Sequence, residues 1–183
     1  MSLVKKVSPL SIDLRRRLLV SKRRVVVKKT KVCSEEYGVT TLSTKGGKFH
    51  AHRKSPCEEC PWRKDVPTKV FPADAFRESA DTSYDAAVKT FACHVSGAEK
   101  PATCAGFLLR HGENNLSIRL SLTGEKINLS SIHDGGFPIY DSYRDMAIAN
   151  GVPENDPCLT NVRANDDVWD YVNRNWKANT DDE

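Results

Sequence analysis

The distribution of apolar and polar residues predicts short elements, with strands near the N-terminus and helices in the rest of the chain. Residues 24–32 are rich in valine and lysine, and their β-branched character predicts a strand. A serine–proline pair before residues 10–20 is typical of a helix start, so we expect a short basic helix there. Two glycines in residues 45–48 predict a turn, and residues 37–42 with Phe49 would form a β-hairpin around it.

The remaining elements are expected to be mostly helical. Helices are predicted for residues 71–77, 83–88, 104–110, 114–122, 141–150 and 168–176, from their caps and the spacing of apolar residues. Gly151 and Pro153 form a stop signal after the fifth of these. Residues 91–94 favour a brief strand instead. The sequence therefore predicts an α+β fold, with a small, mostly helical domain and a possible β-hairpin in an N-terminal arm.

Composition limits the class of protein. The 183 residues are 39% hydrophobic and 28% charged, which suits one modest core and excludes a large multidomain enzyme. No apolar run is long enough for a membrane-spanning helix, and the N-terminus does not resemble a signal peptide. We therefore expect a soluble, cytoplasmic protein with no membrane partner. The expected organisation is a basic arm over residues 1–49, a Cys/His domain over 50–178 and an acidic tail over 179–183.

Charge is distributed unevenly along the chain. The first 32 residues hold eleven Lys/Arg and one Asp, a net charge of +10, whereas the whole chain carries only +4. Such an arm favours nucleic acid or another polyanion as partner, because basic side chains on phosphates release counterions. The candidate contacts are Arg15, Arg16, Arg17, Lys22, Arg23, Arg24, Lys28, Lys29, Arg63 and Lys64. A solvated tail, an arm folded back on the acidic body, and a targeting or membrane-surface helix are the alternatives.

Cysteine and histidine spacing predicts a metal site. Cys57 and Cys60 form a C-x₂-C pair, which lets two thiolates converge on one ion, and Cys93 with Cys104 would supply the second half. His94 is the substitute ligand if one cysteine points away. Trp62, beside the pair, would either pack over the sulfurs or, with Arg63 and Lys64, offer a stacking surface to a nucleic-acid strand.

Zinc (Zn²⁺) is the favoured cofactor, and an iron–sulfur cluster is the alternative, since sulfur ligation suits both and the spacing matches no ferredoxin run. Buried cysteines without any metal are a further interpretation. The zinc deaminase signature is incomplete, because no His-x-Glu precedes the C-x₂-C pair. A hydrolase using His94, His111 or His133 would need an open metal position, so an enzyme is not favoured and no catalytic residue is assigned.

Several ordered motifs resemble those of one family. They are residues 57–65 (CEECPWRKD), 91–94 (FACH), 104–107 (CAGF) and 146–152 (MAIANGV). Together they resemble a family of small cysteine-rich proteins of unassigned function in bacteriophages and bacteria, over about residues 56–152. The resemblance supports the grouping of the four cysteines with His94. It also implies a phage or prophage origin, hence the cytoplasm of a bacterial host.

These observations together favour a non-enzymatic, zinc-binding accessory or regulatory protein that associates with nucleic acid through its basic arm. Two alternatives remain at this point. One is an iron–sulfur regulator that responds to oxidation through its thiolates. The other is a protein inhibitor of a host enzyme, in which the acidic body caps or imitates another molecule.

Overall fold

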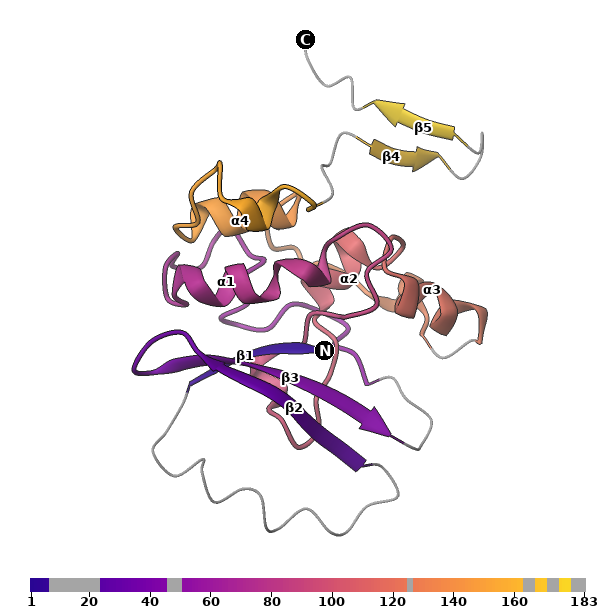
Figure 1. Ribbon diagram of the computed structural model, residues 1–183. Coiled ribbons are helices and arrows are strands. Elements are labelled where there is room, and N and C mark those ends of the chain that lie inside the picture. Colours follow the sequence, from indigo (N-terminus) through magenta and orange to yellow (C-terminus); the bar gives the residue numbers. More distant parts are fainter. Residues whose placement is uncertain (7–23, 46–50, 125–126, 163–166, 171–174, 179–183) are drawn as a thin grey trace.

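A computed structural model describes residues 1–6, 24–45, 51–124, 127–162, 167–170 and 175–178 (Figure 1). The fold is α+β, with a small antiparallel sheet on one side of a group of short helices. Among the described residues, no helix has both the length and the apolar character needed to cross a bilayer. The predicted basic helix over residues 10–20 lies outside the described residues.

Three strands form the sheet, in the order β1–β3–β2. They are β1 (Ser2–Lys6), β2 (Arg24–Val32) and β3 (Tyr37–Lys45). The strand predicted for residues 24–32 is confirmed. Most of the turn predicted for residues 45–48, and Phe49 after it, lie outside the described residues. Residues 37–42 belong to β3, which pairs with β2 through the preceding turn and with β1 on its other edge. The β2–β3 register shifts at Lys28, which forms a β-bulge at the sheet edge.

Both faces of the sheet are covered. Val39 and Leu42 of β3 are buried on opposite faces, since they are an odd number of residues apart. Val39 belongs to the main core together with Phe76, whereas Leu42 packs with Leu3 and Ala92. β1 is also tied to the following part of the chain, because the amide of Ser2 donates to the carbonyl of Thr90 at 2.9 Å. The N-terminal strands and the helices therefore form one packed unit.

Four short α-helices complete this unit. They are α1 (Ala73–Ser79), α2 (Ala105–His111), α3 (Leu116–Thr123) and α4 (Tyr143–Ala149). Asn115 caps α3 by accepting from the amide of Ile118, and Ser142 caps α4 by accepting from the amide of Asp145. Four of the predicted helices lie within a few residues of their expected positions, and these two caps explain the agreement for α3 and α4.

Single 3₁₀ turns and irregular chain make up much of the rest. The 3₁₀ segments are η2 (Ala80–Thr82), η3 (His94–Ser96), η4 (Leu129–Ser131) and η5 (Pro157–Leu159). The expectation of a mostly helical domain is wrong, because each α-helix has only seven or eight residues and long connections separate them. The helix predicted for residues 83–88 is also absent, and that stretch holds turns and loop.

The C-terminal helix predicted for residues 168–176 is wrong as well. Strands β4 (Asp167–Asp170) and β5 (Asn175–Ala178) occupy this part of the chain and pair antiparallel (Figure 1). Trp169 pairs with Trp176 across the ladder. Trp169 and Trp176 are seven positions apart, which fits one side of a helix, whereas Trp169 and Tyr171 are two positions apart, which fits one face of a strand. The pattern alone was therefore ambiguous.

Trp62 is at the centre of the main core. Its side chain is fully buried, and its ring makes edge contacts with Phe91, Phe107 and Tyr143 at centroid distances of 6.0–6.4 Å. His111 lies at 5.5 Å from the same ring. Stacking of Trp62 on a nucleic-acid base is therefore wrong, because no face of the ring is accessible. The ring packs among aromatic side chains, and its packing over the sulfurs stays a prediction.

Candidate metal centre

The first half of the cysteine site is the turn between Cys57 and Cys60. The amide of Cys60 donates to the carbonyl of Cys57 at 3.2 Å, and the amide of Arg63 donates to the carbonyl of Cys60 at 3.0 Å. These bonds form two successive tight turns, which bring both side chains to the same side of the loop. Cys57 and Cys60 are both buried, with exposed fractions of 6% and 0%.

The second half comes from two segments that lie side by side. The amide of Cys93 donates to the carbonyl of Ala102 at 2.8 Å, and the amide of Cys104 donates to the carbonyl of Phe91 at 2.9 Å. Cys93 immediately precedes η3, whose first residue is His94, and Cys104 immediately precedes α2. Backbone pairing thus brings two cysteines together although ten residues separate them in sequence.

The two halves meet in the core. Cys60 Sγ lies 3.6 Å from Cys104 Sγ, and Cys57 Sγ lies 3.1 Å from His94 Nε2. The Cys57 thiol also forms hydrogen bonds with the thiols of Cys60 and Cys93. All four cysteines are reduced and almost inaccessible to solvent. The residues grouped from their spacing therefore form one continuous cluster, in which the four cysteines are buried and His94 is half-buried.

Clustering and burial favour the protonated form of three thiols, those of Cys57, Cys60 and Cys93. The hydrogen bond with Cys60, together with burial, raises the pKa of Cys57 to about 12. The pKa of Cys60 is raised by its hydrogen bond with Cys104, and that of Cys93 by its hydrogen bond with Cys57. Burial lowers the pKa of His94, which favours the neutral imidazole. At neutral pH the thiols of Cys57, Cys60 and Cys93 and the imidazole of His94 are therefore uncharged, and a cation binding to these thiols would have to displace their protons.

Within the described ranges, no group of three or more His, Cys, Asp or Glu side chains is arranged to hold a metal ion. The cluster consists instead of pairwise contacts between thiols and the imidazole. Tetrahedral zinc with Zn–S bonds of about 2.3 Å has sulfurs about 3.8 Å apart. The Cys60–Cys104 separation of 3.6 Å is close to that value.

Arg63 and Lys64, predicted to contact nucleic acid, are both engaged with acidic residues. Arg63 makes two hydrogen bonds to the carboxylate of Asp65, at 2.8 and 2.5 Å, and its guanidinium stacks on the ring of Phe137 at 3.6 Å. Lys64 pairs with Asp141 at 2.8 Å. Each cation is thus paired with a carboxylate, and Lys64 shares that of Asp141 with Arg110.

The other predicted nucleic-acid contacts belong to β2 or precede it. Lys28 and Lys29 are exposed on this edge strand, and Lys29, like Lys31, pairs with Glu78 of α1. Arg24 begins β2. The remaining five, Arg15, Arg16, Arg17, Lys22 and Arg23, lie outside the described residues.

The two histidines considered as catalytic groups elsewhere in the chain have different surroundings. His111 is buried in the core, where its Nε2 accepts from the amide of Tyr143 at 3.3 Å and so orients the start of α4. His133 is exposed in a loop. Neither imidazole is therefore in the cysteine cluster.

A pocket beside the C-x₂-C turn was not predicted. It has a volume of about 240 Å³, and its walls include Pro61, Val66, Pro67 and Phe71. These residues are spread over a segment with no periodic pattern, and the opposite wall comes from Tyr140 and Asn150. No local signal could have found it, because the pocket depends on how distant segments pack.

The fold and the cluster define the chain as a small α+β protein built around buried cysteines. It belongs to the family of unknown function DUF6283, whose model matches residues 52–163. The prediction of a family with no assigned activity is confirmed, and the match includes the whole cysteine cluster. No curated protein and no solved structure matches the chain.

Proposed function

We propose that this chain is a non-enzymatic accessory or regulatory protein whose fold is stabilised by one zinc ion. Cys57, Cys60, Cys93 and Cys104 are the proposed ligands, and His94 is the alternate to Cys93 or Cys57. The observation that carries the proposal is the meeting of four buried thiols and a half-buried imidazole, from three separate segments, in one cluster. Thiolate sulfur and imidazole nitrogen bind zinc in preference to cations such as Mg²⁺ and Ca²⁺, which favour oxygen ligands.

Two features favour a structural role for the ion over a catalytic one. Four protein donors complete a tetrahedral zinc site and leave no position for substrate or water. The cysteines are also buried, whereas a reacting metal must be reached by its substrate. Loss of thiol protons would be compensated by the charge of the cation, since coordinated cysteines bind as thiolates.

Elemental analysis with an absorption spectrum tests the proposal on full-length protein purified without oxygen. We expect about one zinc per chain and no visible absorbance, as for a closed Zn–thiolate site. Iron with acid-labile sulfide and a brown colour would instead support the iron–sulfur regulator. Protein that contains neither metal, and whose melting temperature does not change on adding zinc, would overturn both and leave a metal-free thiol core.

We propose nucleic-acid association as the second function, and β2 supports it. Exposed lysines at positions 28, 29 and 31 follow one edge strand, within an N-terminal segment of net charge +10. Glu78 balances part of this charge. Lysines on an edge strand have a second use, because their charge prevents the strand from pairing with another chain. The charge of β2 therefore has an explanation that does not involve a polyanion.

The salt dependence of nucleic-acid binding tests this second proposal. We expect the full chain to bind duplex DNA or RNA with an affinity that falls steeply between about 50 and 200 mM salt. Lys28→Gln should reduce the salt slope by about 0.9 if that lysine contacts a phosphate. Lys100→Gln, an exposed lysine outside β2, is the matched control and should leave the slope unchanged. Absent or salt-independent binding would reject the proposal.

A further inference from the structure

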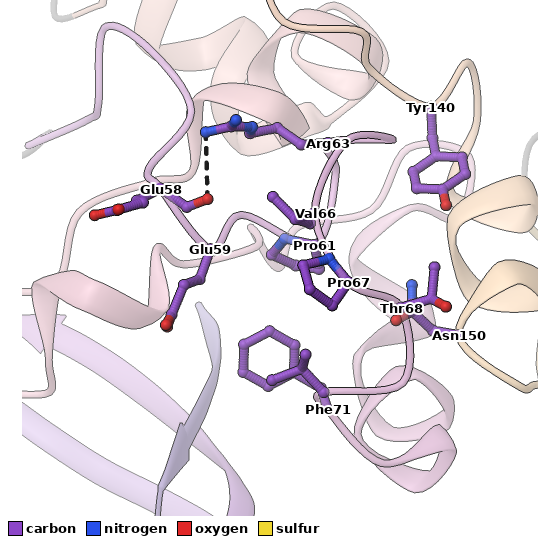
Figure 2. Close-up of a pocket in the computed structure, with 11 residues that line it drawn as sticks. Glu58, Glu59, Pro61, Arg63, Val66, Pro67, Thr68, Phe71, Tyr140 and Asn150 are labelled. Atoms are coloured by element: carbon purple, nitrogen blue, oxygen red, sulfur yellow. Dashed lines mark hydrogen bonds between the residues drawn. The ribbon is translucent and has the colours of Figure 1, made fainter.

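The pocket beside the C-x₂-C turn combines apolar walls with a negative end. Prolines 61 and 67, Val66 and the Phe71 ring form the apolar part, and Glu58 and Glu59 of the turn stand at one side (Figure 2). Apolar walls with one or two polar groups are typical of sites that bind a ligand in a defined orientation.

The single basic residue of the pocket does not neutralise this end. Arg63 donates two hydrogen bonds to the carboxylate of Asp65. Its Nη1 donates to the backbone carbonyls of Cys57 and Glu58, at 3.4 and 3.2 Å. Among the described residues, neither Glu58 nor Glu59 has a basic group within ion-pair distance. The pocket therefore presents uncompensated negative charge.

The two carboxylates differ in position. Figure 2 shows the Glu59 side chain extending toward the Phe71 side of the pocket, whereas Glu58 points away from the apolar walls. Glu59 also acts electrostatically on His94, whose ring lies 5.1 Å from that of Phe71. Glu59 is thus the carboxylate that a ligand seated against Phe71 would meet.

The loop that forms the apolar wall is held in a defined conformation. Lys69 has a φ of 63°, a left-handed conformation that is costly for a residue with a side chain. Its amide donates to Oδ1 of the buried Asn150 at 2.9 Å, which fixes residues 66–71 against α4. A preformed pocket loses less entropy on binding than one that must be ordered by its ligand.

We propose that this pocket binds a basic side chain of a partner polypeptide, an arginine or a lysine. The methylene stem would pack between the prolines and Val66, and the cation would reach Glu59 and the Phe71 ring. Charge complementarity selects this occupant over a neutral apolar or an acidic side chain. The inference does not depend on the metal, because the pocket and both carboxylates are described independently of it.

The test uses small probes and charge-only variants of the full chain. Binding of n-butylguanidinium and of its neutral analogue n-butylurea is followed by NMR shifts of the Val66 and Thr68 methyl groups. We expect the cation to bind about two- to fivefold more tightly than the neutral probe, the range of an exposed ion pair. Glu59→Gln should remove that preference. Glu58→Gln, its immediate neighbour, is the matched control and should largely retain the preference.

Three results would overturn the proposal. These are equal affinity for the charged and neutral probes, an unchanged preference in Glu59→Gln, and shifts at methyl groups outside the pocket. Thr68→Trp, which adds bulk at an exposed lining position, should abolish binding of both probes without loss of the circular dichroism spectrum. Metal content measured in the same samples separates this test from the zinc proposal, since Glu59→Gln leaves every proposed ligand in place.

Discussion

Substitution of Cys60 by serine is expected to unfold the protein at room temperature. Cys60 is fully buried and its Sγ lies 3.6 Å from that of Cys104, at the junction of the two halves of the cluster. A structural zinc ion contributes of order 10 kcal/mol to folding in small metal-binding domains, and whole domains are stable by only about 5–15 kcal/mol. Loss of one of four ligands should therefore cost most of the free energy of unfolding.

Thermal unfolding followed by circular dichroism, with and without EDTA, measures this effect. Wild-type protein should lose cooperative unfolding in the chelator, and Cys60→Ser should lack it in both conditions. Cys158→Ser is the matched control, because Cys158 is partly buried outside the cluster and should change stability little. If EDTA has no effect on the wild type, and Cys60→Ser unfolds cooperatively with only a modest loss, the cysteines are ordinary core residues.

Substitution of Gly106 by alanine is expected to destabilise the fold by about 2–3 kcal/mol, at the upper end of overpacking costs. A β-carbon at position 106 would lie 2.4 Å from Cβ and 2.7 Å from Cγ of Trp62. Trp62 has no room to move, since Phe91, Phe107 and Tyr143 surround its ring. Helix α2 would have to shift away from the core, and Cys104 at its N-terminus would shift with it.

The sign of the stability change in Gly106→Ala tests the close packing of Gly106 against Trp62. At an exposed helical position, Gly→Ala stabilises a protein by up to about 1 kcal/mol, because alanine has the higher helix propensity. Urea unfolding of Gly106→Ala should therefore show a loss where propensity alone predicts a gain. Arg119→Ala, on the exposed side of α3, controls for a new alanine in a helix and should change stability by less than about 0.5 kcal/mol. An increase in stability for Gly106→Ala would contradict the close contact with Trp62.

Both predictions concern one connected part of the molecule. Cys60 and Trp62 belong to the same loop, and Cys104 and Gly106 belong to the start of α2. The thiol pair and the tryptophan–glycine contact therefore join the same two segments at neighbouring points. A metal held by the cysteines would act directly on the packing of the aromatic core.

Local sequence determined the elements whose signals are contained within a few residues. The valine-rich run of β2 formed a strand because its side chains favour extended backbone, and the caps of α3 and α4 began helices where a side chain could accept from the backbone. Spacing also sufficed to group the cysteines. A C-x₂-C turn brings its own two thiols together, and further cysteines in a short reduced chain have few other partners.

Tertiary structure decided which segments pair and which charges remain available. β3 pairs with both β1 and β2, and the C-terminal segment forms β4 and β5 rather than a helix. Arg63 and Lys64 look basic in sequence, yet in the fold they pair with Asp65 and the distant Asp141. Strand partners, ion pairs and the walls of the pocket depend on contacts between residues far apart in the chain. Their free energy comes from burial and pairing in the assembled fold, so no local pattern contains it.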